Sequence, residues 1–103
     1  MELKFPTREQ LRRVYATDLT HSFLPVELKL LYIIEEMWAD KKYQPLCLFD
    51  GDKAVGECFL WRGNPGWALL DYLCVSPGRR NAGLGSFLLH QLHLVLPDTV
   101  ILG

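Results

Sequence analysis

The spacing of apolar residues predicts two helices in the first part of the chain. Thr7 opens the segment Thr-Arg-Glu-Gln, a capping box that is typical of a helix N-terminus, and apolar residues follow it at helical spacing as far as Leu19. Residues 20–24 are expected to form a loop. A second helix is predicted from Pro25, which suits a first helical turn, to about Tyr43. Apolar residues cover much of its circumference, so it should be largely buried.

From Pro45 onward the pattern becomes that of strands. The predicted strands cover residues 46–49, 54–61 and 67–75, with turn signals between them, so they should form an antiparallel meander. A loop, a third helix over residues 84–96 and a strand beginning at Thr99 follow. Because a strand–helix–strand connection is right-handed and joins parallel strands, the sequence predicts an α+β fold on a mixed sheet. A ligand site is expected where the long strand ends and the third helix begins.

Composition narrows the classes of protein. The 103 residues are half hydrophobic and 22% charged, which fits one folded domain rather than a disordered chain. A net charge of -1 argues against a nucleic-acid partner, and no apolar run is long enough to predict a membrane partner. The three cysteines lack metal-ligand spacing, which predicts buried thiols, no metal site and a cytoplasmic location.

The loop before the third helix has the composition of an anion site. Gly83 and Gly85 leave backbone amides uncovered where a helix begins, and Arg79 and Arg80 precede them. The Walker pattern fails because Leu84 and Gly85 stand where Lys and Ser or Thr are required. The dinucleotide pattern GxGxxG fails because its third glycine is replaced, and because antiparallel hairpins precede the loop.

A third pattern does match. Residues 80–85, Arg-Asn-Ala-Gly-Leu-Gly, resemble the (Gln/Arg)-x-x-Gly-x-(Gly/Ala) signature with which GNAT acetyltransferases hold acetyl-CoA. Residues 72–77, Tyr-Leu-Cys-Val-Ser-Pro, resemble the end of the strand that precedes that signature, and the order of elements agrees along the chain. The resemblance implies a GNAT-like fold and an N-acetyltransferase. Such an enzyme passes an acetyl group from acetyl-CoA to a primary amine of a small molecule or peptide, by direct attack in a ternary complex.

The resemblance also implies which residues bind the co-substrate. The pyrophosphate should lie on the loop amides and the pantetheine arm along the strand end, which involves Leu73, Cys74, Val75, Arg80, Asn81, Ala82, Gly83, Leu84, Gly85 and Ser86.

Two carboxylates are candidates for taking the proton from the amine, Asp71 and Glu57. Asp71 has the same parity as Leu73 and Val75, so all three should face one side of the sheet. A structural role for either carboxylate, satisfied by a cation or a helix amide, remains the alternative. Cys74 has no histidine partner in the motif and is expected to be a core residue.

Complete GNAT domains continue beyond the elements predicted here, so residues 1–103 are expected to form one incomplete domain. The alternative to an active enzyme is therefore a non-catalytic CoA-binding or interaction module, or an inactive fragment. An open sheet edge would favour a homo-oligomer.

Overall fold

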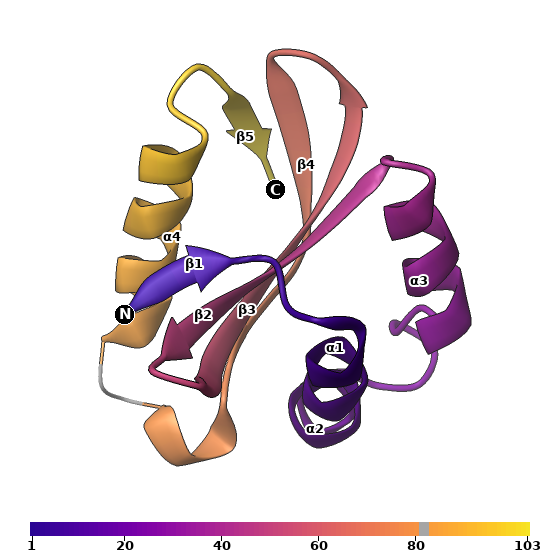
Figure 1. The fold of residues 1–103 in the computed structure, drawn as a ribbon, viewed down its shortest axis with the longest axis vertical. Helices are drawn as coiled ribbons and strands as arrows, with labels where there is room; N and C mark the ends of the chain where they lie inside the picture. The colour runs from indigo at the N-terminus through magenta and orange to yellow at the C-terminus, as the bar shows by residue number, and fades with distance from the viewer. Residues whose placement is uncertain (81–82) are drawn as a thin grey trace.

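The computed structural model describes residues 1–80 and 83–103, and its centre is a five-stranded sheet with helices on both faces (Figure 1). The strands lie side by side in chain order. Each of the first four is antiparallel to its neighbour, and the fifth is parallel to the fourth. They are β1 (Glu2–Lys4), β2 (Tyr43–Asp50), β3 (Lys53–Asn64), β4 (Trp67–Val75) and β5 (Val100–Leu102). The predicted α+β fold on a mixed sheet is confirmed.

The first helical segment is continuous but not uniform. It consists of α1 (Arg8–Val14), a π-helical turn η1 (Tyr15–Leu19) and α2 (Thr20–Ser22), so the loop predicted over residues 20–24 is wrong for its first three residues. The predicted capping box is present, because the amide of Gln10 donates to Thr7 Oγ1 at 3.1 Å and the amide of Thr7 donates to Gln10 Oε1 at 2.8 Å. The wider π turn shifts the helical period, and it buries Asp18 as well as Leu19.

The second predicted helix is much shorter than its apolar pattern suggests. α3 covers only Leu31–Ala39, and Ile34 is its one buried residue. Residues 23–30 form an irregular loop before it, and Tyr43 already belongs to β2. Proline has no N–H to donate to a neighbouring strand. Pro45 is tolerated within β2 because β1 pairs only with residues 47–49, so no strand on that side needs a hydrogen bond from residue 45. β1 itself, three residues long, was not predicted.

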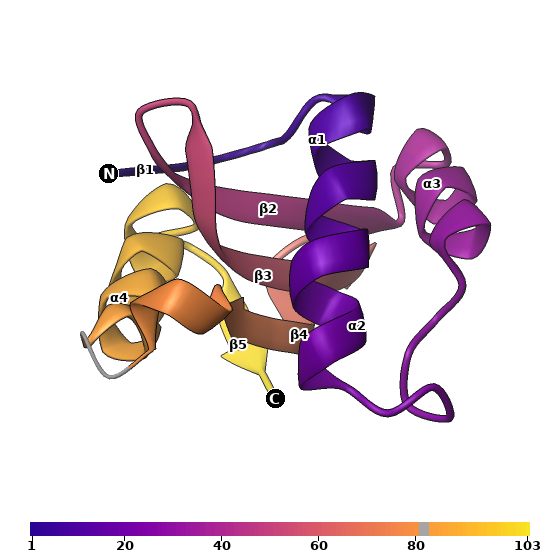
Figure 2. The ribbon, with the colours of Figure 1, turned by 90° about the horizontal axis from the view of Figure 1, so that it is seen from below.

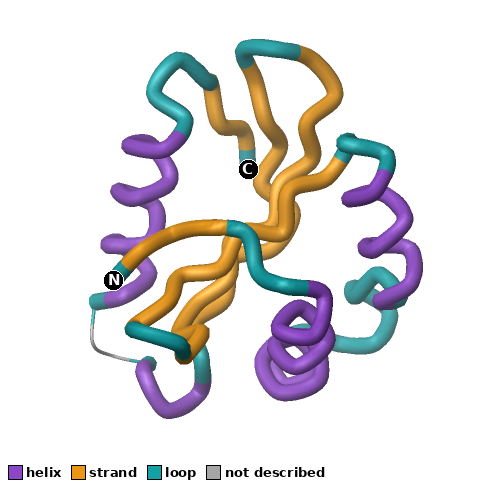
Figure 3. The backbone as a smooth tube through the Cα atoms, viewed as in Figure 1, coloured by secondary structure: helices purple, strands orange, loops and turns teal. Residues whose placement is uncertain are grey.

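α4 (Leu84–Val95) connects β4 to β5, as the crossover rule requires. It covers one face of the sheet, whereas α1, α2 and α3 cover the other (Figures 2 and 3). Consecutive residues of β3 supply the two cores: Leu60 packs in the cluster under α4, and Phe59 packs in the cluster under α1 and α3. The sheet therefore carries a hydrophobic layer on each side, and β4 ends between them.

Candidate functional site

The first turn of α4 leaves backbone donors available. The structure places Gly83 as the N-cap residue with φ +74°, a left-handed conformation that glycine adopts without a steric penalty. The amide of Phe87 donates to the carbonyl of Gly83 at 3.2 Å, and within residues 1–80 and 83–103 no side chain caps the helix. The amides before Phe87 therefore have no acceptor within the helix, and they lie at the end where the helix dipole is positive.

The predicted loop residues around this turn differ in their surroundings. Leu84 is buried in the core under α4 and anchors the turn, whereas Ser86 is exposed. A Cβ placed on Gly85 would meet no atom of the described residues within 4 Å, so a side chain has room at this position. Asn81 and Ala82, the remaining residues of the signature, lie outside the described part of the chain.

Both arginines of the loop have partners within the protein. The guanidinium of Arg79 lies 3.1 Å from Asp50 Oδ2. Arg80 donates from Nη2 to Ser22 Oγ at 2.6 Å and from Nε to the carbonyl of Val75 at 3.3 Å. Arg80 thus joins the end of α2 to the end of β4, and its guanidinium is turned toward the strand end rather than toward α4.

The C-terminal half of β4 has a free edge. β5 pairs with β4 only from Trp67 to Leu69. Leu73, Cys74 and Val75 pair with β3, and no described strand pairs with their other edge, although the side chain of Arg80 donates to the carbonyl of Val75. Backbone groups along such an edge can bind an extended ligand as an additional strand would.

A bulge interrupts β4 at Asp71. In the register with β3, Phe59 pairs with Tyr72 and Leu60 pairs with Leu70, which leaves Asp71 without a partner residue. A bulge inserts one residue and so reverses the alternation of side chains.

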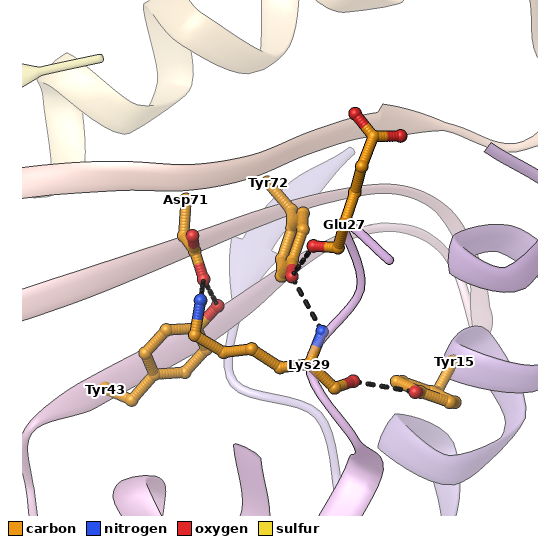
Figure 4. Close-up of polar contacts among 6 residues, drawn as sticks. All are labelled: Tyr15, Glu27, Lys29, Tyr43, Asp71 and Tyr72. Carbon is orange, nitrogen blue, oxygen red and sulfur yellow. Dashed lines mark hydrogen bonds and ion pairs between the residues drawn. The ribbon is translucent and has the colours of Figure 1, made fainter. Parts of the chain in front are cut away.

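The expectation that Asp71 shares a face with Leu73 and Val75 is therefore wrong. Leu73 and Val75 pack against the core under α4. Asp71 instead contacts Lys29 and Tyr43 on the opposite side of the sheet, where α1 and α3 lie (Figure 4).

Asp71 is the centre of a small polar cluster. Its Oδ2 atom accepts a hydrogen bond from the hydroxyl of Tyr43 at 2.5 Å and lies 2.7 Å from Nζ of Lys29. The ammonium of Lys29 also lies 5.5 Å from the ring centre of Trp61 and 5.3 Å from that of Tyr72. Burial, followed by the bond to Asp71, raises the pKa of Tyr43 far above its ordinary value, so the phenol remains a donor.

Tyr72 fixes the irregular loop to the sheet. Its hydroxyl donates to the carbonyl of Glu27 at 2.7 Å and accepts from the amide of Lys29 at 2.8 Å (Figure 4). The hydroxyl of Tyr15 donates to the carbonyl of Lys29 at 2.7 Å. The backbone of Lys29 is thus held at both its amide and its carbonyl, independently of its side chain.

Glu57 lies on β3 beneath the π turn and is completely buried. Neither of its oxygens accepts a hydrogen bond from a donor in the described residues. Burial, and secondarily the nearby carboxyl of Asp18, raises the pKa of Glu57 to about 10. Asp18 itself accepts a hydrogen bond from Ser76 Oγ at 2.6 Å, and two carboxyls close together disfavour a second negative charge. Glu57 is therefore a neutral acid at physiological pH.

Cys74 has the surroundings of a core thiol. It is 5% exposed, and its sulfur lies 3.1 Å from Ser22 Oγ. Burial raises the pKa of Cys74 to about 11, so the nucleophilic thiolate is scarce at neutral pH. All three cysteines are free and buried.

Several residues at this site could not be predicted from the sequence. Lys29 lies 42 positions from Asp71 in a segment that resembles a helix, and Tyr43 lies at the end of the same segment. Asp18 is polar in an otherwise amphipathic helix, and only its proximity to the buried face distinguishes it from a surface residue. Within residues 1–80 and 83–103, no cluster of histidine, cysteine and acidic side chains could hold a metal ion. No described helix has the length and apolar character needed to cross a membrane.

A family model described as the acetyltransferase (GNAT) family matches residues 8–93. Among solved structures, a protein from Bacteroides thetaiotaomicron described as a GNAT-family acetyltransferase is similar at a TM-score of 0.73 and 21% identity, over 93% of this chain and 56% of that one. An aminoglycoside 6'-N-acetyltransferase complexed with coenzyme A has a TM-score of 0.66 and 21% identity, over 94% of this chain and 56% of the other.

An acetyltransferase from Thermus thermophilus has a TM-score of 0.70 and 22% identity, over 96% of this chain and 72% of the other. At these identities the likeness is one of fold. The chain spans 56% of the length of each of the first two structures. No curated protein matches it in sequence.

Proposed function

The chain belongs to the acetyltransferase (GNAT) family, and we propose on that premise that it takes part in the transfer of an acetyl group from acetyl-CoA to a primary amine. The observation that carries the proposal is the uncapped first turn of α4, with Gly83 and Gly85 exposing its backbone. Amides at the positive end of a helix are suited to the pyrophosphate of coenzyme A.

The free edge of β4 supports the second half of the co-substrate site. Backbone groups of Leu73, Cys74 and Val75 would bind the amide-containing pantetheine arm as a strand binds its neighbour. An amide in this stretch would also donate to the thioester carbonyl oxygen and stabilise the negative charge that develops there. Acetyl-CoA supplies the activated acetyl group, and the residues of the chain orient it.

Asp71 fits the role of proton acceptor better than Glu57 does. An alkylammonium has a pKa of about 10 and must lose a proton before it can attack. Glu57 has a raised pKa and no exposed surface, so it is already protonated. Asp71 lies at the bulge, two residues before the proposed thioester contacts, and its side chain already binds an ammonium group. We therefore assign the role to Asp71.

Binding of acetyl-CoA is tested by placing a carboxylate on the first turn of α4. Gly85→Glu adds a side chain where no atom lies within 4 Å, so the variant should fold normally. The carboxylate would occupy the proposed phosphate position, and calorimetry should show at least a tenfold loss of acetyl-CoA affinity. Gly78→Glu is the matched control, because Gly78 also has open surroundings but precedes the signature. Equal affinity of Gly85→Glu and the wild type would overturn the assignment.

Turnover is tested separately, by release of the CoA thiol in the presence of primary amines. Asp71→Asn retains a side chain of similar size but cannot accept the proton, so the rate should fall by about 100-fold, a size typical of general-base loss, with acetyl-CoA affinity unchanged. Acetyl-CoA binding without thiol release in the wild type would favour the non-catalytic module.

A further inference from the structure

The ammonium of Lys29 occupies a site with the chemistry of a receptor for alkylammonium ions. A carboxylate lies 2.7 Å from the nitrogen, and two aromatic rings lie within 5.5 Å of it. Both charged side chains are largely shielded, with exposures of 27% for Lys29 and 17% for Asp71. Shielding from water strengthens the attraction between a cation and both a carboxylate and the faces of aromatic rings.

The loop that carries Lys29 is held by contacts that do not involve the lysine side chain. Hydrogen bonds from Tyr15 and to Tyr72 hold the backbone carbonyl and amide of Lys29. The loop is further fixed through the carbonyl of Glu27. A change of side-chain rotamer at Lys29 therefore vacates the carboxylate and both rings, and its backbone anchors remain in place.

The site also lies where an acceptor amine is needed. Asp71 lies at the bulge of β4, and the free edge that begins beyond it is the proposed place of the acetyl thioester. An ammonium bound to Asp71 would be next to the carboxylate that takes its proton. With Lys29 in place, the carboxylate of Asp71 is already paired with an ammonium group of the protein.

We infer that Asp71, Tyr43, Trp61 and Tyr72 form the ammonium subsite of the acceptor, and that Lys29 is an internal competitor that the acceptor must displace. This inference rests on the proposed acetyl transfer. The class of ligand follows from Lys29, which now occupies the site. Because its side chain presents an ammonium group on four methylenes, the expected ligand is an unbranched primary alkylamine. A free diamine and a lysine side chain of a peptide share this chemistry.

Binding of two probes, 1,4-diaminobutane and Nα-acetyl-lysine methylamide, tests the inference in the absence of acetyl-CoA. Lys29→Ala removes the competitor and should increase the affinity for at least one probe by tenfold or more, since a tethered group competes at a high effective concentration. The double variant Lys29→Ala with Asp71→Asn should lose this gain. The probe that gains more identifies the free amine or the peptide side chain as the source.

Lys4→Ala is the matched control. The ammonium of Lys4 also lies 5.3 Å from an aromatic ring centre, that of Phe49, and pairs with a carboxylate, that of Glu2, but at a different place on the sheet. It should leave both affinities at the wild-type value. If Lys29→Ala does not fold, Lys29→Met, which retains an apolar stem between the rings, decides by the same comparison.

A folded Lys29 variant with wild-type affinity for both probes would overturn the subsite, as would a gain that persists when Asp71 is replaced. Acetyl-CoA binding is measured in parallel on the same variants. A wild-type protein that does not bind acetyl-CoA would instead refute the proposed function, so the two failures are distinguishable.

Discussion

Glu57 places a carboxyl group in the interior, where no described donor satisfies it. The interior disfavours its charged form, so the folded protein holds a proton that the unfolded chain releases near the ordinary pKa of 4.5. Between that value and the folded pKa of about 10, the folded state binds more protons than the unfolded state, and stability falls as pH rises.

Glu57→Gln should remove this pH dependence. The amide has no proton to release, and it can donate to the carboxylate of Asp18. Urea unfolding between pH 5 and pH 9 should show the wild type losing stability relative to the variant, by at most about 1.4 kcal/mol per pH unit. Glu36→Gln, at an exposed position, controls for the change in net charge. Parallel pH profiles of the wild type and Glu57→Gln would contradict a buried neutral Glu57.

The two glycines at the start of α4 should respond oppositely to alanine. Gly83 has φ +74°, where a Cβ costs about 1–2 kcal/mol, so Gly83→Ala should destabilise the protein by that amount. Gly85 lies within the helix at an ordinary φ and in open space, so Gly85→Ala should be neutral or stabilising by about 0.5–1 kcal/mol. Chemical denaturation measures both, and equal effects would mean that the left-handed cap is absent in solution.

At the scale of elements, polar contacts from Tyr15, Asp71 and Tyr72 hold the loop of residues 23–30. Tyr72 makes two hydrogen bonds to its backbone, whereas Leu24, Val26 and Leu30 are 64%, 92% and 56% exposed. An element with so little buried apolar surface opens locally at a low free-energy cost. Hydrogen bonds therefore have to supply the stability that apolar packing does not give this loop.

Tyr72→Phe should release this loop while the sheet persists. Two hydrogen bonds are lost, and each contributes about 0.5–1.5 kcal/mol. Amide hydrogen exchange of residues 24–30 should accelerate by tenfold or more, and exchange in β3 should change much less. Tyr32→Phe removes the hydroxyl of a tyrosine that is 58% exposed and serves as the control. Unchanged exchange in the loop would show that other contacts hold it.

Elements with local signals could be predicted from the sequence. The capping box at Thr7, the glycine turn after Asp50 and Gly83 before α4 each require a particular residue at a particular place, and the structure has all three. The signature of residues 80–85 depends on the same kind of local requirement, so the sequence alone indicates a phosphate-binding loop.

Elements that depend on distant partners could not be predicted. Nothing local distinguishes the bulge at Asp71 from regular strand, because it is defined by the register with β3. The pairing of Lys29 with Asp71 follows from that bulge, since regular alternation would have turned the carboxylate toward α4. The apolar run before α3 also suggests a helix, but in this loop the backbone carbonyl of Glu27 and both backbone groups of Lys29 bond to tyrosine hydroxyls instead.

At the scale of the whole molecule, one sheet separates two hydrophobic clusters that share no buried residue. Leu88 of α4 belongs to one cluster and Phe59 of β3 to the other, and both are fully buried. Because β2, β3 and β4 contribute residues to both clusters, loss of either layer exposes a face of the same strands. The two layers should therefore unfold together.

Leu88→Ala should cost about 2–5 kcal/mol and Phe59→Ala about 3–5 kcal/mol, the range for large-to-small substitutions in a core. Each should lower the midpoint of a single transition. Two of the three tryptophans, Trp38 and Trp61, pack against the cluster of Phe59, so fluorescence is weighted toward that layer, whereas far-ultraviolet circular dichroism reports on every helix. If Leu88→Ala shifted the dichroism transition but left the fluorescence transition unchanged, the layers would be independent. Coincident shifts in both variants are expected, because the strands between the layers cannot remain paired when one of their faces is exposed to water.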